Sequence, residues 1–196
     1  MRHTHLSLLA LLALAACGDG TTNDSASSSS AAATTEETSD RSLTPQGYGD
    51  MRIGMSANDL TALVGTSPNA QNTGDPEACM YFHPDQAPAG VLVMVEAGTL
   101  TRISLTDGAD ISSDRGIHVG DAAAKVKAAY GDTLLESPHK YVEAPAAYLT
   151  VWADGREAPY VSAPEARGIR YEIGADGKVT AIHAGGPAIQ YVEGCS

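Results

Sequence analysis

The chain has 196 residues, with 24 Asp or Glu against 12 Lys or Arg, and a formal net charge of −12 at pH 7. Proteins that bind nucleic acid cluster Lys and Arg to displace counterions, and this sequence has no such cluster. We therefore expect no nucleic-acid partner. Acidity of this size also repels anionic lipid headgroups, so any attachment to a membrane must have another cause.

The first seventeen residues have the organisation of a secretory signal. Arg2 gives a positive start, residues 6–14 form an apolar run too short to span a membrane, and small residues follow. The sequence Leu-Ala-Ala-Cys at residues 14–17 resembles the lipobox of bacterial lipoproteins, in which signal peptidase cuts before the cysteine and the cysteine carries the lipid. The resemblance implies a signal peptide at residues 1–16 and lipidation of Cys17.

The position of the anchor follows from the residue after the lipobox. Gly18 stands where an Asp often retains such lipoproteins at the inner membrane, so we expect an outer-membrane anchor facing the periplasm or the cell surface. The alternative is an ordinary secreted protein in which Cys17 is incidental. In either case Cys79 and Cys195 remain, and because an exported compartment is oxidising we expect a disulfide between them. Two buried free thiols or a reactive pair are the alternatives, and the pair lacks Cys-x-x-Cys spacing.

A tether is predicted from Cys17 to residue 46. Its Ser, Thr, Ala, Asp and Glu residues show almost no apolar periodicity, so the segment cannot bury enough surface to offset its ordering entropy. As a random coil it would hold a folded domain roughly 30 Å from the membrane on average. The globular domain is predicted to span residues 47–196.

The elements of the globular part alternate between short helices and strands. Ser56 is placed to cap a helix that ends at Gly65, and Asp59 completes a capping box. Asp121 is predicted to cap a second helix that ends at Gly131. Strands are predicted at residues 79–82, 91–96, 99–105, 147–152, 168–173, 178–184 and 188–193, with turns at residues 97–98 and 176–177. The fold class is therefore α+β, with helices packed on antiparallel sheet.

The two halves share one spacing. When Gly54 is laid on Gly120, Leu60 falls on Val126 and Gly65 falls on Gly131, and residues 98–103 correspond to residues 177–182. We predict two tandem repeats, at about residues 47–109 and 116–196, each a short helix packed on an antiparallel sheet. The second repeat is longer by thirteen residues between helix and hairpin, and most of the excess is a loop at residues 154–167.

This pattern resembles the β-lactamase-inhibitor-protein-like fold and is similar to the small outer-membrane lipoproteins of the SmpA/OmlA type. The residues that carry the resemblance are Ile53, Gly54, Met55, Ser56, Leu60 and Gly65, and in the second copy Val119, Gly120, Asp121, Val126 and Gly131. The resemblance implies binding to other proteins, either inhibiting a secreted enzyme or supporting an envelope assembly, and no catalytic residue accompanies it. The second copy has Asp-Ala-Ala at residues 121–123 in place of the usual Met-Thr-Lys/Arg run, which leaves the particular partner open.

Two kinds of motif are missing from the sequence. There is no Gly-x-Ser-x-Gly elbow and no zinc spacing, and Asp107, Asp110 and Asp114 lack the ligand pattern of an EF-hand. We predict a non-enzymatic protein without cofactor or metal. The alternatives are a purely structural surface protein, or a small envelope hydrolase acting on peptidoglycan or carbohydrate, built around His118 or His139 with nearby carboxylates such as Asp121 or Glu136.

Aromatic residues suggest where a partner binds. All eight tyrosines and the single tryptophan lie in the globular part, and Tyr148, Trp152 and Tyr160 surround the loop at residues 154–167. Tyr and Trp are enriched in protein interfaces, so we expect an envelope or secreted protein to bind there. The alternative is that Tyr148 and Trp152, which share one face of a strand, fill the core.

Overall fold

The computed structural model describes residues 41–66, 71–72 and 78–195. The signal peptide, the lipidation site at Cys17 and the tether as far as residue 40 lie outside the described residues, so these stay predictions. Within the described ranges no helix is long and apolar enough to cross a membrane.

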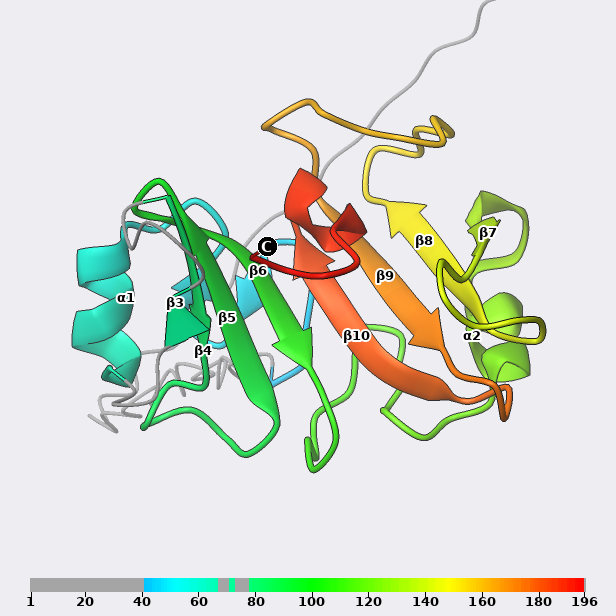
Figure 1. Ribbon diagram of the computed structural model, residues 1–196, viewed down its shortest axis with the longest axis horizontal. Helices are drawn as coiled ribbons and strands as arrows, with labels where there is room; N and C mark the ends of the chain where they lie inside the picture. The colour runs from blue at the N-terminus through cyan, green and yellow to red at the C-terminus, as the bar shows by residue number, and fades with distance from the viewer. Residues whose placement is uncertain (1–40, 67–70, 73–77, 196) are drawn as a thin grey trace, which may run out of the picture. The chain divides into compact units, whose positions relative to one another are not determined.

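The described residues form an α+β domain on one eight-stranded antiparallel sheet, with strand order β3-β4-β5-β6-β10-β9-β8-β7 (Figure 1). The first and last groups of four strands meet where β6 pairs with β10. The strands are β3 (Gln71–Asn72), β4 (Cys79–Phe82), β5 (Val91–Glu96), β6 (Thr99–Leu105), β7 (Leu135–Pro138), β8 (Ala147–Trp152), β9 (Gly168–Ile173) and β10 (Val179–Gly185). A separate hairpin, β1 (Gly47–Tyr48) with β2 (Met51–Arg52), precedes the first helix.

The first helix, α1 (Ala57–Val64), begins and ends as its sequence predicts. The Ser56 side chain accepts a hydrogen bond from the Asp59 backbone N–H at 3.1 Å and donates to the Asp59 carboxylate at 2.7 Å. Gly65 closes the helix with a positive φ of 74°, and its N–H donates to the carbonyl of Thr61. Because L side chains rarely adopt that backbone conformation, glycine at this position stops the helix at low cost.

The predicted cap of the second helix, α2 (Ala123–Tyr130), is wrong. The N-cap residue is Ala122, which makes no side-chain cap, and Asp121 lies one residue earlier. The Asp121 carboxylate instead accepts hydrogen bonds from the backbone N–H of His118 and from Lys125 Nζ, both at 2.7 Å. The same two donors hold the pKa of Asp121 below its usual range.

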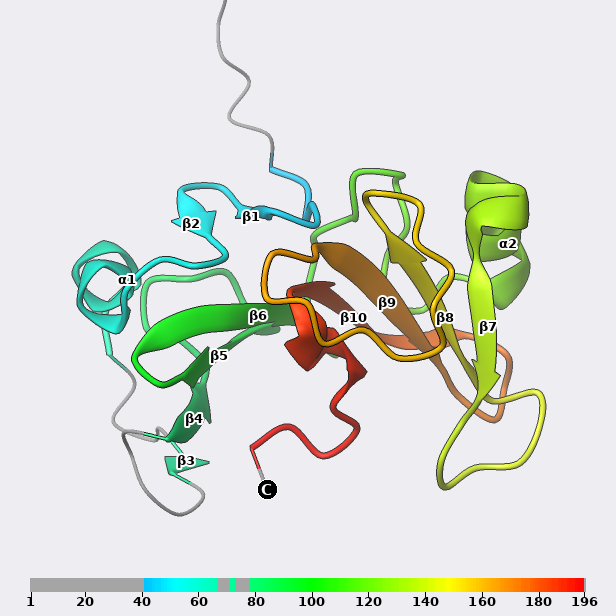
Figure 2. The ribbon, with the colours of Figure 1, turned by 90° about the horizontal axis from the view of Figure 1, so that it is seen from above.

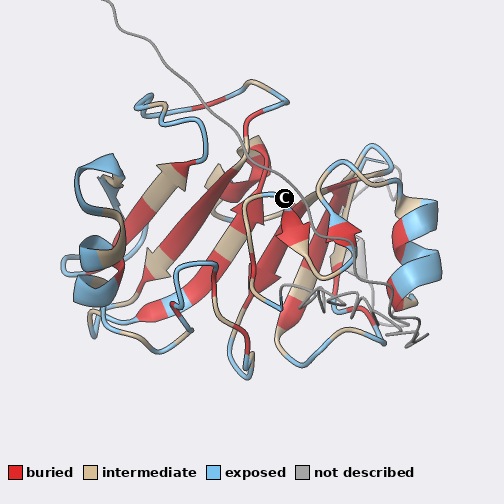
Figure 3. Cartoon of the chain, turned by 180° about the vertical axis from the view of Figure 1, so that it is seen from behind, coloured by how far each residue is buried: buried red, intermediate tan, exposed pale blue. Residues whose placement is uncertain are grey.

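Alternation along the strands gives the sheet two different faces. One face packs under α1, α2 and the β1–β2 hairpin, while the C-terminal segment lies on the opposite side (Figure 2). Figure 3 shows the buried residues along the strands and the exposed outer sides of both helices. The main apolar core on the helix side includes Leu60 of α1, Val126 of α2, and strand residues Val93, Ile103, Leu105, Leu149, Ile169, Tyr171 and Ile182. Burial of this face holds helices that are too short to be stable alone.

The folded part begins before the predicted boundary at Gly47. Leu43 is fully buried, its N–H donates to the carbonyl of Ser112 at 2.8 Å, and its carbonyl accepts from Asp114 N at 2.9 Å. Residues 43–46 therefore belong to the domain and not to the tether. A single leucine in a polar segment creates no periodicity, so the sequence pattern gave no sign of this contact.

Most predicted strands are confirmed, and one is wrong. The bounds of β4, β5, β6, β8 and β9 match, and β10 lies one residue beyond its predicted position. Residues 188–193 are not a strand: Pro187–Gln190 forms a 3₁₀ helix, η2, and the chain then crosses the sheet face. The strand β7 was not predicted, because its sequence lacks apolar alternation. Its position at the edge of the sheet is the place where a strand tolerates Pro138.

The backbone connections of the two helices to their following hairpins correspond to each other. Near α1, Gly54 N donates to Leu100 O and Ala57 N donates to Gly98 O, both at 2.8 Å. Near α2, Gly120 N donates to Val179 O at 2.8 Å, and Ala123 N donates to Gly177 O at 2.9 Å. Each helix is thus attached at its N-terminus to the second strand and turn of a hairpin.

Candidate functional site

The sheet face opposite α1 and α2, here called the second face, carries a set of mostly polar and aromatic side chains. By strand register they are Tyr81, Met94, Arg102, Ser104, Tyr148, Thr150, Trp152, Arg170, Glu172 and His183. Three segments lie on this face: residues 139–146, residues 154–167 and the C-terminal residues 187–195. Both buried arginines of the described structure, Arg102 and Arg170, lie on this face together with the buried Ser104, which makes it the candidate site.

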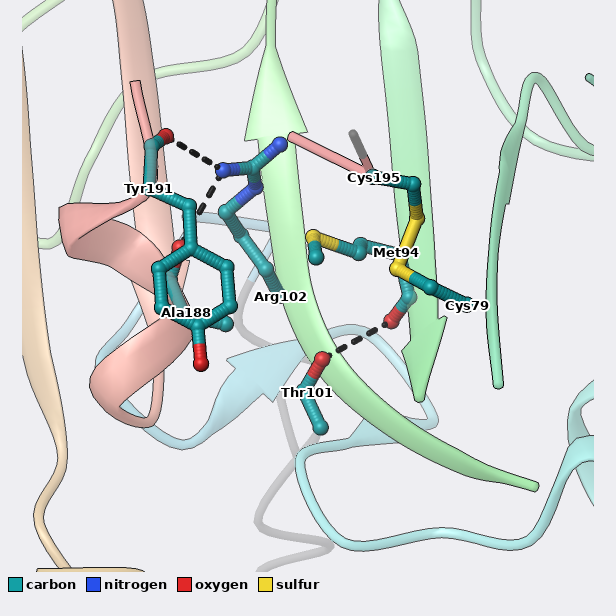
Figure 4. Close-up of a disulfide and its surroundings, with 7 residues drawn as sticks. All are labelled: Cys79, Met94, Thr101, Arg102, Ala188, Tyr191 and Cys195. Carbon is teal, nitrogen blue, oxygen red and sulfur yellow. Dashed lines mark hydrogen bonds between the residues drawn. A yellow bond between two sulfur atoms is a disulfide. The ribbon is translucent and has the colours of Figure 1, made fainter. Parts of the chain in front are cut away.

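Two buried arginines hold the C-terminal segment. Arg102 and Arg170 are only 4% and 8% exposed. Arg102 Nη1 donates to the carbonyls of Ala188 and Tyr191, both at 3.1 Å (Figure 4), and Arg170 Nη1 donates to Gln190 O at 2.8 Å and Ile189 O at 3.4 Å. Both guanidiniums therefore cap the carbonyls at the end of η2. Burial lowers the pKa of both side chains, and no carboxylate of the described residues forms an ion pair with either.

The predicted disulfide is present between Cys79 and Cys195, with a Cα–Cα distance of 5.6 Å. It joins the end of the chain to β4 and packs with Met94 and Ala188 (Figure 4). A disulfide of this kind is typical of an exported protein. The C-terminal segment is thus fixed at its end by a covalent bond and along its length by two arginines.

A row of polar side chains crosses the second face from β6 to the loop after β7. His183 Nδ1 lies 2.8 Å from Ser104 Oγ, His183 Nε2 lies 3.6 Å from Glu172 Oε2, and His139 Nε2 lies 3.2 Å from Glu172 Oε1. Interaction with His183 and then His139 lowers the pKa of Glu172 to about 2, although burial opposes the shift. Burial lowers the pKa of His183 to about 4.

This row resembles a Ser–His–carboxylate arrangement in its order, but Ser104 is only 1% exposed. A nucleophile must reach its substrate, so in this conformation the row is better suited to holding residues 139–146 on the sheet. His139 supports this role, because it stacks on Tyr148 at 4.7 Å between ring centroids. Among the described residues no group of three or more His, Cys, Asp or Glu side chains is placed to hold a metal ion.

The row predicts a loss of stability in acid. Unfolded His183 takes up a proton below about pH 6.5, while the folded form stays neutral down to about pH 4, and Glu172 behaves likewise between 4.5 and about 2. Both groups bind more protons when unfolded, so the free energy of unfolding falls as pH decreases through these windows, by up to about 1.4 kcal/mol per pH unit for each proton.

Urea denaturation at a series of pH values checks this expectation. The variant His183→Asn should flatten the profile between pH 6.5 and 4, and Glu172→Gln should flatten it below pH 4.5. If the free energy of unfolding of both variants changes with pH as steeply as that of the wild type, other groups cause the acid sensitivity.

The predicted aromatic cluster is divided between the interior and the surface. Tyr148 and Trp152 are buried, at 4% and 3% exposed, whereas Tyr160 is 64% exposed. Tyr148 lies between His139 and the guanidinium of Arg170, whose central carbon is 3.7 Å from the ring centroid. Tyr148 therefore supports its neighbours from beneath the surface. Of the predicted cluster, Tyr160 is the residue that is exposed to a partner.

Trp152 and Tyr160 do come together at a pocket of about 430 Å³, here called the Trp152 pocket. It opens beside β7 and β8, and its lining includes Leu135, Trp152, Pro159, Tyr160, Arg170 and Gln190. Two of the three residues grouped around the loop at residues 154–167 thus line one pocket, and binding there stays a prediction. Arg170 and Gln190 had no local sequence signal that linked them to this feature.

Of the residues considered for a hydrolase, His118 lies beside Asp121, whereas His139 does not pair with Glu136. His118 Nδ1 lies 3.9 Å from Asp121 Oδ2 near the start of α2, and Glu136 Oε2 lies 2.7 Å from Lys127 Nζ. His139 pairs with Glu172 and not with Glu136. Glu172 is the residue that sequence reasoning missed. Its only signal was polar alternation in a strand whose other residues are mostly apolar.

Exposed aromatic side chains surround the second face. Tyr141 is 61% exposed, Tyr160 is 64% exposed and Tyr191 is 37% exposed, and each belongs to a different one of the three segments on this face. Val142, beside Tyr141, is 39% exposed. Of the large apolar side chains exposed in the described structure, only Leu63 of α1 lies elsewhere.

Comparisons with known proteins give little further information. No family model matches the sequence, and no curated protein matches it. Among solved structures, the chain is similar to an extracellular protein containing an SCP domain from Bacillus anthracis str. Ames, with a TM-score of 0.43 and 12% sequence identity. The similarity covers 68% of this chain and 44% of the Bacillus chain, so the matched part spans less than half of that protein.

Proposed function

We propose that this protein is a non-enzymatic protein-binding module of the bacterial envelope, and that its partner docks on the second face. The observation that carries this proposal is the exposure of Tyr141, Tyr160 and Tyr191 on three separate segments around that face. Tyrosine offers rigid apolar area with a polar tip and is enriched where proteins bind each other.

Preorganisation of the three segments supports the proposal. The side chain of Gln190 accepts from Val161 N at 2.9 Å and donates to Val161 O at 2.7 Å, which fastens the loop at residues 154–167 to the C-terminal segment. Arg170 binds the Gln190 carbonyl, and His139 fastens the third segment to Glu172. A surface that is already ordered loses less conformational entropy when a partner binds.

The proposal includes the lipid anchor at Cys17 in the outer membrane and the origin of the domain as two tandem repeats. Two observations support the repeats. The hydrogen bonds at Gly54 and Gly120 correspond to each other, and along the chain each helix is followed by four strands that are neighbours in the sheet. The anchor is supported by the lipobox-like sequence and by the disulfide of an exported protein.

In-cell photo-crosslinking tests the docking surface. A photoreactive residue at position 160 or 141 is expected to attach one abundant envelope protein, which mass spectrometry identifies. Position 63 on α1 is the matched control, because Leu63 is exposed on the opposite side. The variant Cys17→Ala provides an unanchored form. It should give no crosslinked product if the protein binds its partner at the membrane.

Two results would count against the proposal. If position 63 crosslinks the same protein with the same yield as positions 160 and 141, the partner does not dock specifically on the second face. A blank from positions 160 and 141 would favour the structural or hydrolase alternatives, and for the latter turnover of peptidoglycan or ester substrates should then disappear in His139→Ala.

A further inference from the structure

Arg170 has donor groups that nothing in the described structure uses. Its Nη1 atom binds two carbonyls, but its Nε has no hydrogen-bond partner although it is buried, and its Nη2 makes no hydrogen bond among the described residues. The side chain lines the Trp152 pocket. The ring of Tyr148 compensates part of the Arg170 charge, but the unused donors and the missing ion pair remain, so an anionic group from outside would be bound there.

The surroundings of Arg170 restrict the kind of anion. Glu136 and Glu157 also line the pocket, and Glu136 is already paired with Lys127 at 2.7 Å. Two carboxylates at the same site repel a ligand with several negative charges, such as a phosphate group, but tolerate a single carboxylate. Glu157 remains able to accept an N–H group from the ligand.

The apolar part of the pocket lining further restricts the kind of ligand that fits. Trp152, Leu135 and Pro159 provide an apolar wall in the same pocket of about 430 Å³ that contains Arg170. A residue at the end of a polypeptide carries a carboxylate and a side chain on the same carbon atom, so one apolar C-terminal residue matches both parts of the pocket. An Asp or Glu side chain brings a carboxylate without an apolar group beside it.

We propose that the Trp152 pocket binds the C-terminal residue of a protein partner, with the terminal carboxylate on Arg170 and an apolar side chain against Trp152. This inference rests on the proposed function, since it names the part of the partner that the second face recognises. Charge-assisted hydrogen bonds of a guanidinium to a carboxylate give both affinity and orientation.

The single tryptophan of the chain makes the pocket directly measurable. An acetylated tetrapeptide that ends in leucine with a free carboxylate is titrated against the purified domain, and Trp152 fluorescence is recorded. A saturable change is expected. The same peptide with a C-terminal amide should bind at least about tenfold more weakly, because it loses a charge-assisted hydrogen bond. A C-terminally amidated peptide with a glutamate side chain distinguishes a side-chain carboxylate from a terminal one.

Variants locate the binding within the pocket. Arg170→Gln should lower the affinity for the free-acid peptide to that for the amide peptide. Tyr160→Ala should lower this affinity severalfold, and Leu63→Ala on α1 should leave it unchanged. Circular dichroism establishes that each variant is folded. If Arg170→Gln does not fold, the comparison of acid and amide peptides together with Tyr160→Ala decides the question.

Three outcomes would overturn the inference: no saturable signal, equal binding of the acid and amide peptides, or equal binding of the glutamate peptide. Each of these leaves the crosslinking test of the docking surface intact. Crosslinks at positions 160 and 141 without peptide binding would therefore reject the C-terminal residue as the recognised group while keeping the protein partner.

Discussion

Replacing Cys79 and Cys195 together by serine should lower the free energy of unfolding by about 4 to 5 kcal/mol. The two cysteines are 116 positions apart, so the disulfide closes a loop that includes most of the domain. In the chain-entropy model, a loop of this length removes a large part of the conformational freedom of the unfolded chain. Urea denaturation followed by Trp152 fluorescence measures the loss.

The wild-type protein under reducing conditions is the control, because it keeps both cysteine side chains and lacks only the disulfide bond. It should lose as much stability as the double serine variant. A loss of less than about 1 kcal/mol in both would mean that the unfolded chain gains little freedom when the bond is absent, contrary to the chain-entropy model.

The elements of the fold that could be predicted are those with a strong local signal. Two short strand patterns with a turn at residues 97–98 between them indicated β5 and β6, and the capping pair of Ser56 and Asp59 indicated the start of α1. These signals are contained in fewer than ten consecutive residues. The sheet order depends on contacts between distant parts of the chain, and β6 meeting β10 is not visible in the local sequence of either strand.

The second face shows why the rest could not be predicted. In a strand, Arg102 and Arg170 alternate with apolar residues, which is the pattern of a side chain that faces water. The structure buries both because the C-terminal segment covers them and offers backbone carbonyls. The same contact explains the error at residues 188–193, since their carbonyls bind arginines where a strand would bind a neighbouring strand.

Part of the candidate site was nevertheless accessible from the sequence. The sequence grouped Trp152 and Tyr160 around the long loop, and both residues line one pocket. The sequence also raised the alternative that Tyr148 and Trp152 are buried, and both are. The pairing of His139 with Glu172 joins residues 33 positions apart, so only the fold brings them together.

Arg102→Gln is expected to lower the free energy of unfolding by about 3 kcal/mol, because the carbonyls of Ala188 and Tyr191 lose a charged donor in a buried place. Arg102→Lys keeps the charge but presents a single nitrogen, so its loss should be smaller. Arg156→Gln is the control, since that guanidinium is at the surface, pairs with Asp154, and should have no measurable effect. An Arg102→Gln variant as stable as the wild type would mean that desolvating the guanidinium offsets its hydrogen bonds.

Combining this change with the loss of the disulfide tests whether both act on the same segment. In the Cys79→Ser/Cys195→Ser background the end of the chain is no longer joined to β4, so residues 187–195 can leave the sheet at lower cost. The effect of Arg102→Gln should then be smaller than in the wild type, with a coupling energy of about 1 kcal/mol or more in a double-mutant cycle. Additive effects would instead mean that Arg102 holds Ala188 and Tyr191 in place independently of the covalent bond, and that the docking surface survives reduction.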